Sequence, residues 1–145
     1  MSAARPGGRT PLCPSAQPDW DGAMVLGIVN GTVEDPRVVF LAEPQPPTDD
    51  LLALTRPVNP TEVLRIAAPC KADGCAHFDG RDCRLVAKTV ALLPAVVEQL
   101  PPCRIRPRCR WWLQEGRAAC RRCPAVVTEN VRPSEAQRTA ADPSA

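Results

Sequence analysis

Aromatic residues are scarce in this chain of 145 residues, which has two Phe, three Trp and no Tyr. Because aromatic side chains bury the largest apolar areas, the core has to be built from Val, Leu, Ile and Ala. Such a core is thin for a chain that is long enough for one compact domain but too short for two. Small domains with modest cores commonly add disulfides or metal ions, so the eight cysteines are the feature to explain.

The sequence also lacks the marks of a secreted, membrane-spanning or independently catalytic protein. Its first residues contain no apolar signal segment, and no run approaches the roughly 18 apolar residues of a membrane span. We find no Gly-rich phosphate loop, H-E-x-x-H motif or Ser/His/Asp set. We therefore expect a cytoplasmic protein without a membrane partner and without independent catalysis, and the Arg/Ala/Pro bias indicates a GC-rich bacterial genome.

The two ends of the chain are rich in Pro, Ser, Arg and other polar residues and show no periodicity. Such composition is typical of disorder. The sequence therefore predicts disordered tails at 1–18 and 132–145 around a single metal-binding domain at 19–131. Within that domain we distinguish an acidic β/α part at 19–66 and a Cys/His-rich part at 67–131.

Two runs of β-forming residues, Met24–Val29 and Arg37–Leu41, stand on either side of an Asn-Gly pair. This pattern predicts a β-hairpin. Short helices are expected after Thr48, which is an N-cap candidate, and over Thr61–Ile66.

The clearest helical periodicity runs from 83 to 100, and Pro94 is expected to bend or divide that helix. A shorter helix is predicted over 108–115, closed by Gly116, with its two tryptophans on adjacent faces so that at most one is fully buried. The predicted fold class is α+β, a small N-terminal β-hairpin packed on a kinked helix and followed by a Cys-rich metal-binding half.

The cysteines concentrate in two groups. Reducing cytosol keeps thiols free, so clustered cysteines there are more often metal ligands than disulfides. The first group has the pattern C-x4-C-x-H-x5-C, formed by Cys70, Cys75, His77 and Cys83. The second has the pattern C-x5-C-x10-C-x2-C, formed by Cys103, Cys109, Cys120 and Cys123. These eight residues are the predicted metal ligands in two four-ligand sites, and Cys13 is left over in the N-terminal tail.

Both zinc and iron-sulfur clusters suit these ligands, and two zinc ions would contribute folding energy directly. Zinc modules generally use two close pairs, whereas only Cys120 and Cys123 form such a pair here. Cys123 also precedes a proline, as does the last cysteine of bacterial ferredoxin motifs. We therefore favour an iron-sulfur cluster, of the [4Fe-4S] type, on one or both sites. A crossed partition remains open, with Cys70 and Cys75 joining Cys103 and Cys109.

These ligands predict a small metal-binding protein that acts in electron transfer, in redox sensing or as an accessory to a larger enzyme, with a protein partner. The alternative is a zinc-stabilised binding module. Between Cys103 and Cys123 lie seven arginines and one acid, which could contact nucleic acid or an acidic protein. We favour the simpler interpretation that these arginines neutralise thiolates or remain in solvent.

Overall fold

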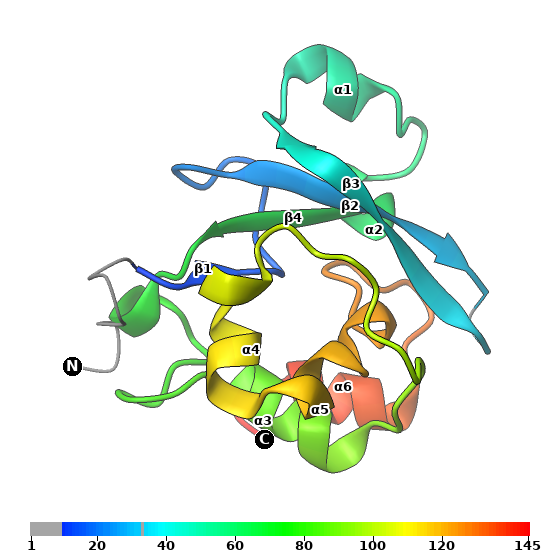
Figure 1. Cartoon of the computed structure of the whole chain (residues 1–145). Helices are drawn as coiled ribbons and strands as arrows, with labels where there is room; N and C mark the ends of the chain where they lie inside the picture. The colour runs from blue at the N-terminus through cyan, green and yellow to red at the C-terminus, as the bar shows by residue number, and fades with distance from the viewer. Residues whose placement is uncertain (1–9, 33) are drawn as a thin grey trace.

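The computed structural model describes residues 10–32 and 34–145. It confirms the mixed α+β class, because six α-helices accompany one four-stranded antiparallel sheet in this part of the chain. The sheet has the order β1-β4-β2-β3 and lies on one side of the molecule, with α3 to α6 gathered on the other and α1 projecting beyond the sheet (Figure 1). The strands are β1 (Leu12–Cys13), β2 (Met24–Gly31), β3 (Pro36–Gln45) and β4 (Leu64–Pro69).

The predicted hairpin is confirmed by β2 and β3, which pair from Gly31 with Pro36 to Val25 with Gln45. Gly31 has φ +83, and a Cβ there would lie 2.3 Å from the carbonyl oxygen of Asp35. Only glycine tolerates both the positive φ and this close approach. The sequence therefore sets the turn of the hairpin at this residue.

Strand β4 was not predicted from the sequence, which favoured a helix over Thr61–Ile66. Helix α2 (Pro60–Val63) is a single turn that begins with a capping box between Asn59 and Glu62. The chain then becomes extended, and every residue from Leu64 to Ala68 is buried. A strand that is buried on both faces has no alternation to reveal it, so periodicity alone does not separate it from a buried helix.

The long helical pattern gives a shorter helix than expected, α3 (Arg84–Leu92), whose C-cap is Leu93. Pro94 explains the end, because a residue before proline is pushed out of the helical region. The helix packs mainly against α6 (Glu135–Ala141) rather than on the hairpin. The remaining helices are α1 (Asp49–Ala53), α4 (Arg110–Glu115) and α5 (Arg117–Cys120).

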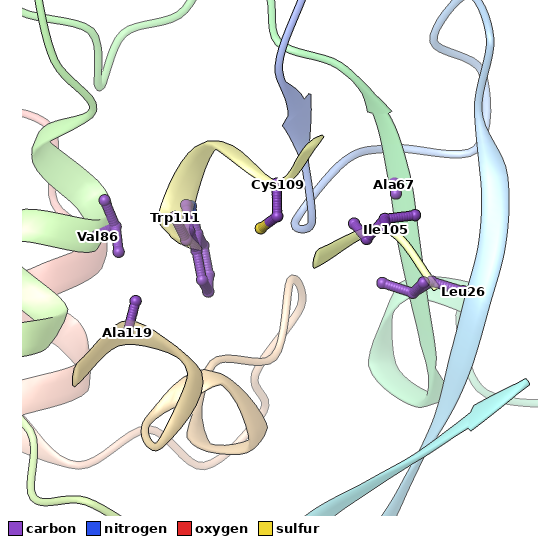
Figure 2. Packing of buried hydrophobic residues seen from close by; sticks show 7 residues of the cluster. All are labelled: Leu26, Ala67, Val86, Ile105, Cys109, Trp111 and Ala119. Carbon is purple, nitrogen blue, oxygen red and sulfur yellow. The ribbon is translucent and has the colours of Figure 1, made fainter. Parts of the chain in front are cut away.

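One core cluster joins the sheet to the helices. Figure 2 shows the ring of Trp111 between Val86 and Ala119 on the helical side and Cys109 on the other. Trp111 is 2% exposed whereas Trp112 is half-buried, as the predicted short helix requires. The cluster comprises Leu26, Ala67, Val86, Ile105, Cys109, Trp111 and Ala119.

The structure has regular elements in segments for which the composition predicted tails. Residues 1–9 lie outside the described residues, but 10–18 contribute β1 and Ala16, which has no exposed surface. Near the other end, Ser134 and Gln137 form a capping box that begins α6. In the described part of the chain, none of the helices has the length and hydropathy needed to cross a membrane.

Candidate metal centres

Two sets of four cysteines each line a hollow in the structure. The N-terminal set consists of Cys13, Cys70, Cys75 and Cys83, and the hollow that they line is called the N-terminal hollow. The C-terminal set consists of Cys103, Cys109, Cys120 and Cys123, which line the C-terminal hollow. All eight cysteines are free thiols. No cysteine of one set lines the hollow of the other, an arrangement that favours the uncrossed partition.

Strand β1 brings Cys13 to the N-terminal set. It pairs antiparallel with β4, so that Cys13 lies opposite Ala68, and the backbone N–H of Cys70 donates to the carbonyl of Pro11 over 2.8 Å. Side chains of successive strand residues point to opposite sides. Cys13 lines the N-terminal hollow, and Pro14, the first residue after the strand, lines the C-terminal hollow. This short strand thus separates the two sets.

The start of α3 places Cys83. Cys83 is the N-cap residue of the helix, and the backbone N–H groups of Val86 and Leu85 oppose the rise that burial causes in the pKa of its thiol. Gln114 of α4 fixes the Cys83 backbone with two hydrogen bonds, accepting from its N–H over 2.8 Å and donating to its carbonyl over 2.9 Å. Cys70 accepts from the backbone N–H of Ala72 over 3.4 Å. These donors suit negatively charged sulfur.

Burial dominates the electrostatics of the N-terminal set. It raises the pKa of Cys13 to about 12, and the backbone N–H of Ser15 opposes the rise. The neighbouring thiols of Cys83, Cys70 and Cys75 raise that pKa further. Burial also raises the pKa of Cys83. Thiols that share a low-dielectric space resist losing protons together unless a positive charge compensates them, which is the role of metal ions in such sites.

His77 lies beside this set rather than replacing one of its thiols. It lines the N-terminal hollow and is half-buried, and among the described residues its Nδ1 has no hydrogen-bond partner. Burial lowers its pKa, and the charges of Lys88 and Arg84 lower it further. The first site therefore contains a fourth cysteine, Cys13, that the sequence pattern missed, in addition to the predicted Cys70, Cys75, Cys83 and His77.

The C-terminal set comes from one continuous segment and matches the predicted residues. Cys109 is the N-cap residue of α4, and the backbone N–H groups of Trp112 and Trp111 oppose the rise that burial causes in the pKa of its thiol. Cys120 ends α5, and Cys123 begins a 3₁₀ turn three residues later. Burial raises the pKa of Cys109, Cys103 and Cys120.

Two arginines lie against the sulfur atoms of the C-terminal set. Arg65 of β4 is 1% exposed, and its Nη1 donates to the Sγ of Cys123 over 2.7 Å. Its Nη2 donates to the carbonyls of Cys123 and Val126. Arg106 opposes the rise that burial causes in the pKa of the Cys120 thiol. A buried guanidinium against sulfur is the charge that a thiolate-rich site requires.

The two hollows differ in size. The C-terminal hollow leaves about 20 Å³ for the centre of a water molecule, little more than the roughly 10–15 Å³ that one water molecule needs. The N-terminal hollow leaves about 290 Å³ by the same measure. In the part of the chain that the structure describes, no three His, Cys, Asp or Glu side chains are arranged around one metal ion.

Helix α4 forms the wall between the hollows. Its preceding residue, Cys109, lines the C-terminal hollow, and Arg110 lines the N-terminal one. Trp111 lines both. Because consecutive helical residues point about 100° apart, one turn of helix serves two neighbouring sites.

Most of the basic segment is held by backbone contacts. Arg122 donates through Nε to the carbonyl of Leu93 over 2.7 Å, and Arg121 through Nε to that of Val97 over 3.3 Å. Arg110 is buried, whereas Arg104 and Arg117 are exposed. The seven arginines therefore do not form one free face.

The family models, curated proteins and solved structures that were compared with this chain gave no match, so its function has to be argued from the geometry of the two cysteine sets.

Proposed function

We propose that the chain is a redox protein that holds an iron-sulfur cluster on each cysteine set and exchanges electrons with a protein partner. The observation that carries this proposal is that four thiols line one hollow, twice, in a chain of 145 residues. Four thiolate ligands are the usual complement of a [2Fe-2S] or [4Fe-4S] cluster. Two such clusters together would use all eight cysteines, four in each set.

The hollow that the thiols line supports a cluster over a single zinc ion. Zinc binds thiolate at about 2.3 Å in a tetrahedron, which holds the sulfur atoms about 3.8 Å apart. The cysteines of the C-terminal set instead line a hollow with space for about one water molecule. A [4Fe-4S] cluster is a larger body that takes one thiolate on each iron. It therefore suits thiols that line a hollow better than a single ion does.

The hydrogen bonds to sulfur also support cluster binding. Arg65 donates to the Sγ of Cys123 over 2.7 Å, and the backbone N–H of Ala72 donates to the Sγ of Cys70 over 3.4 Å. Such donors spread the negative charge of a thiolate-bound cluster and raise its reduction potential. Neutral structural thiols gain little from this arrangement.

Electron transfer is favoured over a purely structural role by the position of Trp111. Its ring is buried and forms part of the wall of both hollows, so the two sites are neighbours. The N-terminal set also approaches the surface, because Lys71 and Ala76 in its loop are exposed. We infer that electrons enter or leave through this loop, where a protein partner docks.

The rival proposal is a zinc-stabilised module that binds nucleic acid or an acidic protein through its arginines. The inward contacts of Arg110, Arg121 and Arg122 leave it less support. Phosphate binding needs guanidinium groups that are free at the surface. Of the seven arginines in this segment, only Arg104 and Arg117 are exposed and meet that condition.

The experiment is to purify the full chain without oxygen, record its visible spectrum, and measure iron, sulfide and zinc per chain. Two [4Fe-4S] clusters require about eight iron and about eight sulfide, broad visible absorbance, and bleaching on reduction. Two zinc ions in a colourless protein would replace the proposal with the binding module. A protein that contains none of these elements would overturn metal binding altogether.

A further inference from the structure

A charged side chain at the N-terminal hollow has no partner. Arg110 is 1% exposed, and among the described residues its Nε, Nη1 and Nη2 have no hydrogen-bond acceptor. Its guanidinium lies over the ring of Phe78, 5.4 Å from the ring centre. Arginine stays protonated in proteins, and an unpaired buried charge is strongly unfavourable. This side chain therefore indicates that an anion belongs beside it.

The residues around the hollow supply no such anion apart from the cysteines. No Asp or Glu lines it, and besides Arg110 its wall contains Lys71 and His77. Two further buried nitrogen atoms without a partner, Nε1 of Trp111 and Nδ1 of His77, belong to the same wall. The positive charge of Arg110 and the unpartnered nitrogen atoms of Trp111 and His77 thus favour a negatively charged ligand that carries oxygen atoms.

The size of the hollow leaves room for that ligand beside a cluster. The C-terminal hollow, with the same number of thiols, leaves about 20 Å³ for water centres, whereas the N-terminal hollow leaves about 290 Å³. Because the same number of thiols borders a much larger space here, the N-terminal hollow has room for a molecule besides them. Leu85, Val126 and Val127 add apolar wall to it.

We propose that the N-terminal hollow binds a small carboxylate beside its cluster, with both carboxylate oxygens on the guanidinium of Arg110. The planar fork of arginine matches a carboxylate in two parallel hydrogen bonds. Trp111 Nε1–H is a further donor, and the apolar wall accommodates a short hydrocarbon chain. This proposal rests on the proposed function in one respect, namely that a cluster is bound to the cysteines on one side of the hollow.

The test uses the full chain as purified without oxygen and propionate as the probe, with propionamide as its uncharged match. Calorimetry at constant ionic strength measures binding, and tryptophan fluorescence follows it independently. We expect saturable binding of one propionate per chain and no binding of propionamide. Arg110→Gln should weaken propionate binding at least tenfold with unchanged iron content. Arg56→Gln, at an exposed position, should bind as the unaltered protein does.

Arg110→Lys is the control for misfolding, because lysine keeps the positive charge but lacks the planar guanidinium group. This variant should bind propionate more weakly than the unaltered protein. Absence of saturable propionate binding would overturn the site, as would equal binding by Arg110→Gln. A loss of iron in Arg110→Gln without propionate binding to the unaltered protein would show that the guanidinium balances cluster charge instead. Absence of iron with Arg110-dependent propionate binding would overturn the proposed function and support the anion site.

Discussion

The two cysteine sets are built differently although each has four thiols. The C-terminal set comes from one continuous segment and lines a small hollow. The buried Arg65 contacts this set through its hydrogen bond to the Sγ of Cys123. The N-terminal set joins Cys13 to residues far along the chain and lines a much larger hollow with an unpartnered Arg110. The small C-terminal hollow excludes a further ligand, whereas the larger N-terminal hollow has space for one. We infer that the C-terminal site stabilises the fold and the N-terminal site meets external chemistry.

The largest effect that would test this contrast is expected from Cys109→Ser. Cys109 belongs both to the C-terminal set and to the main core cluster, so its loss removes a ligand and disturbs packing. We expect iron and sulfide to fall by about half or more and the midpoint of thermal unfolding to fall by roughly 10 °C. Elemental analysis and calorimetry measure the two quantities.

The matched control is Cys75→Ser, at a partly exposed position in the N-terminal set. It should lose a similar amount of iron but shift the unfolding midpoint much less, because little core packing depends on it. Equal shifts in the two variants would remove the distinction between a stabilising and an exchanging site.

A second comparison separates Cys13 from His77 as the fourth ligand. Cys13→Ser should lose about half of the iron and sulfide, because a cluster with three thiolates is bound less tightly. His77→Ala should keep the full complement, because four thiols already line that hollow. The measurement is iron and sulfide per folded chain. The reverse result would restore the ligand set that the sequence pattern predicted.

The C-terminal set was predictable because its four cysteines and their spacing lie in one short segment. Cys13 was not, because its place depends on the pairing of β1 with β4, a contact between residues far apart in sequence. A signal was nevertheless present, since eight cysteines divide into two sets of four without the histidine. The composition around Cys13 instead suggested a tail.

The same division between local and distant information applies to the fold. The turn of the hairpin at Gly31, the end of α3 before Pro94 and the burial of only one tryptophan follow from local rules. Strand β4 does not, because its apolar run reflects neighbours on both faces. Arg65 within that strand looks like a surface residue until its contact with Cys123 is known.

A smaller effect is expected at Arg65 itself. Arg65→Met keeps the apolar stem but removes the donors to the Cys123 sulfur and to two carbonyls. We expect the free energy of unfolding to fall by about 3 kcal/mol and the reduction potential of the C-terminal cluster to become more negative. Denaturant unfolding and a potentiometric titration measure these changes.

Arg37→Met is the control, because Arg37 lies on the neighbouring hairpin and its ion pair with Asp35 is exposed. Exposed pairs contribute about 1 kcal/mol or less. If the free energy of unfolding fell equally in both variants, the contact between Arg65 and the Cys123 sulfur would stabilise the fold no more than an exposed ion pair does. The inference that the C-terminal site stabilises the fold would then lose its main support.

The smallest effect concerns α6, whose Ala141 lines the N-terminal hollow and not the C-terminal one. Ser134→Ala removes the hydroxyl that accepts from the backbone N–H of Gln137 over 3.1 Å. Loss of an N-cap costs about 1 kcal/mol, so we expect a decrease of that size in unfolding free energy, faster amide exchange in α6 and unchanged iron. Ser144→Ala, beyond the helix, should change little. If Ser134→Ala were also silent, α6 would not be formed in solution, the tail predicted from composition would be correct, and the N-terminal hollow would be more open still.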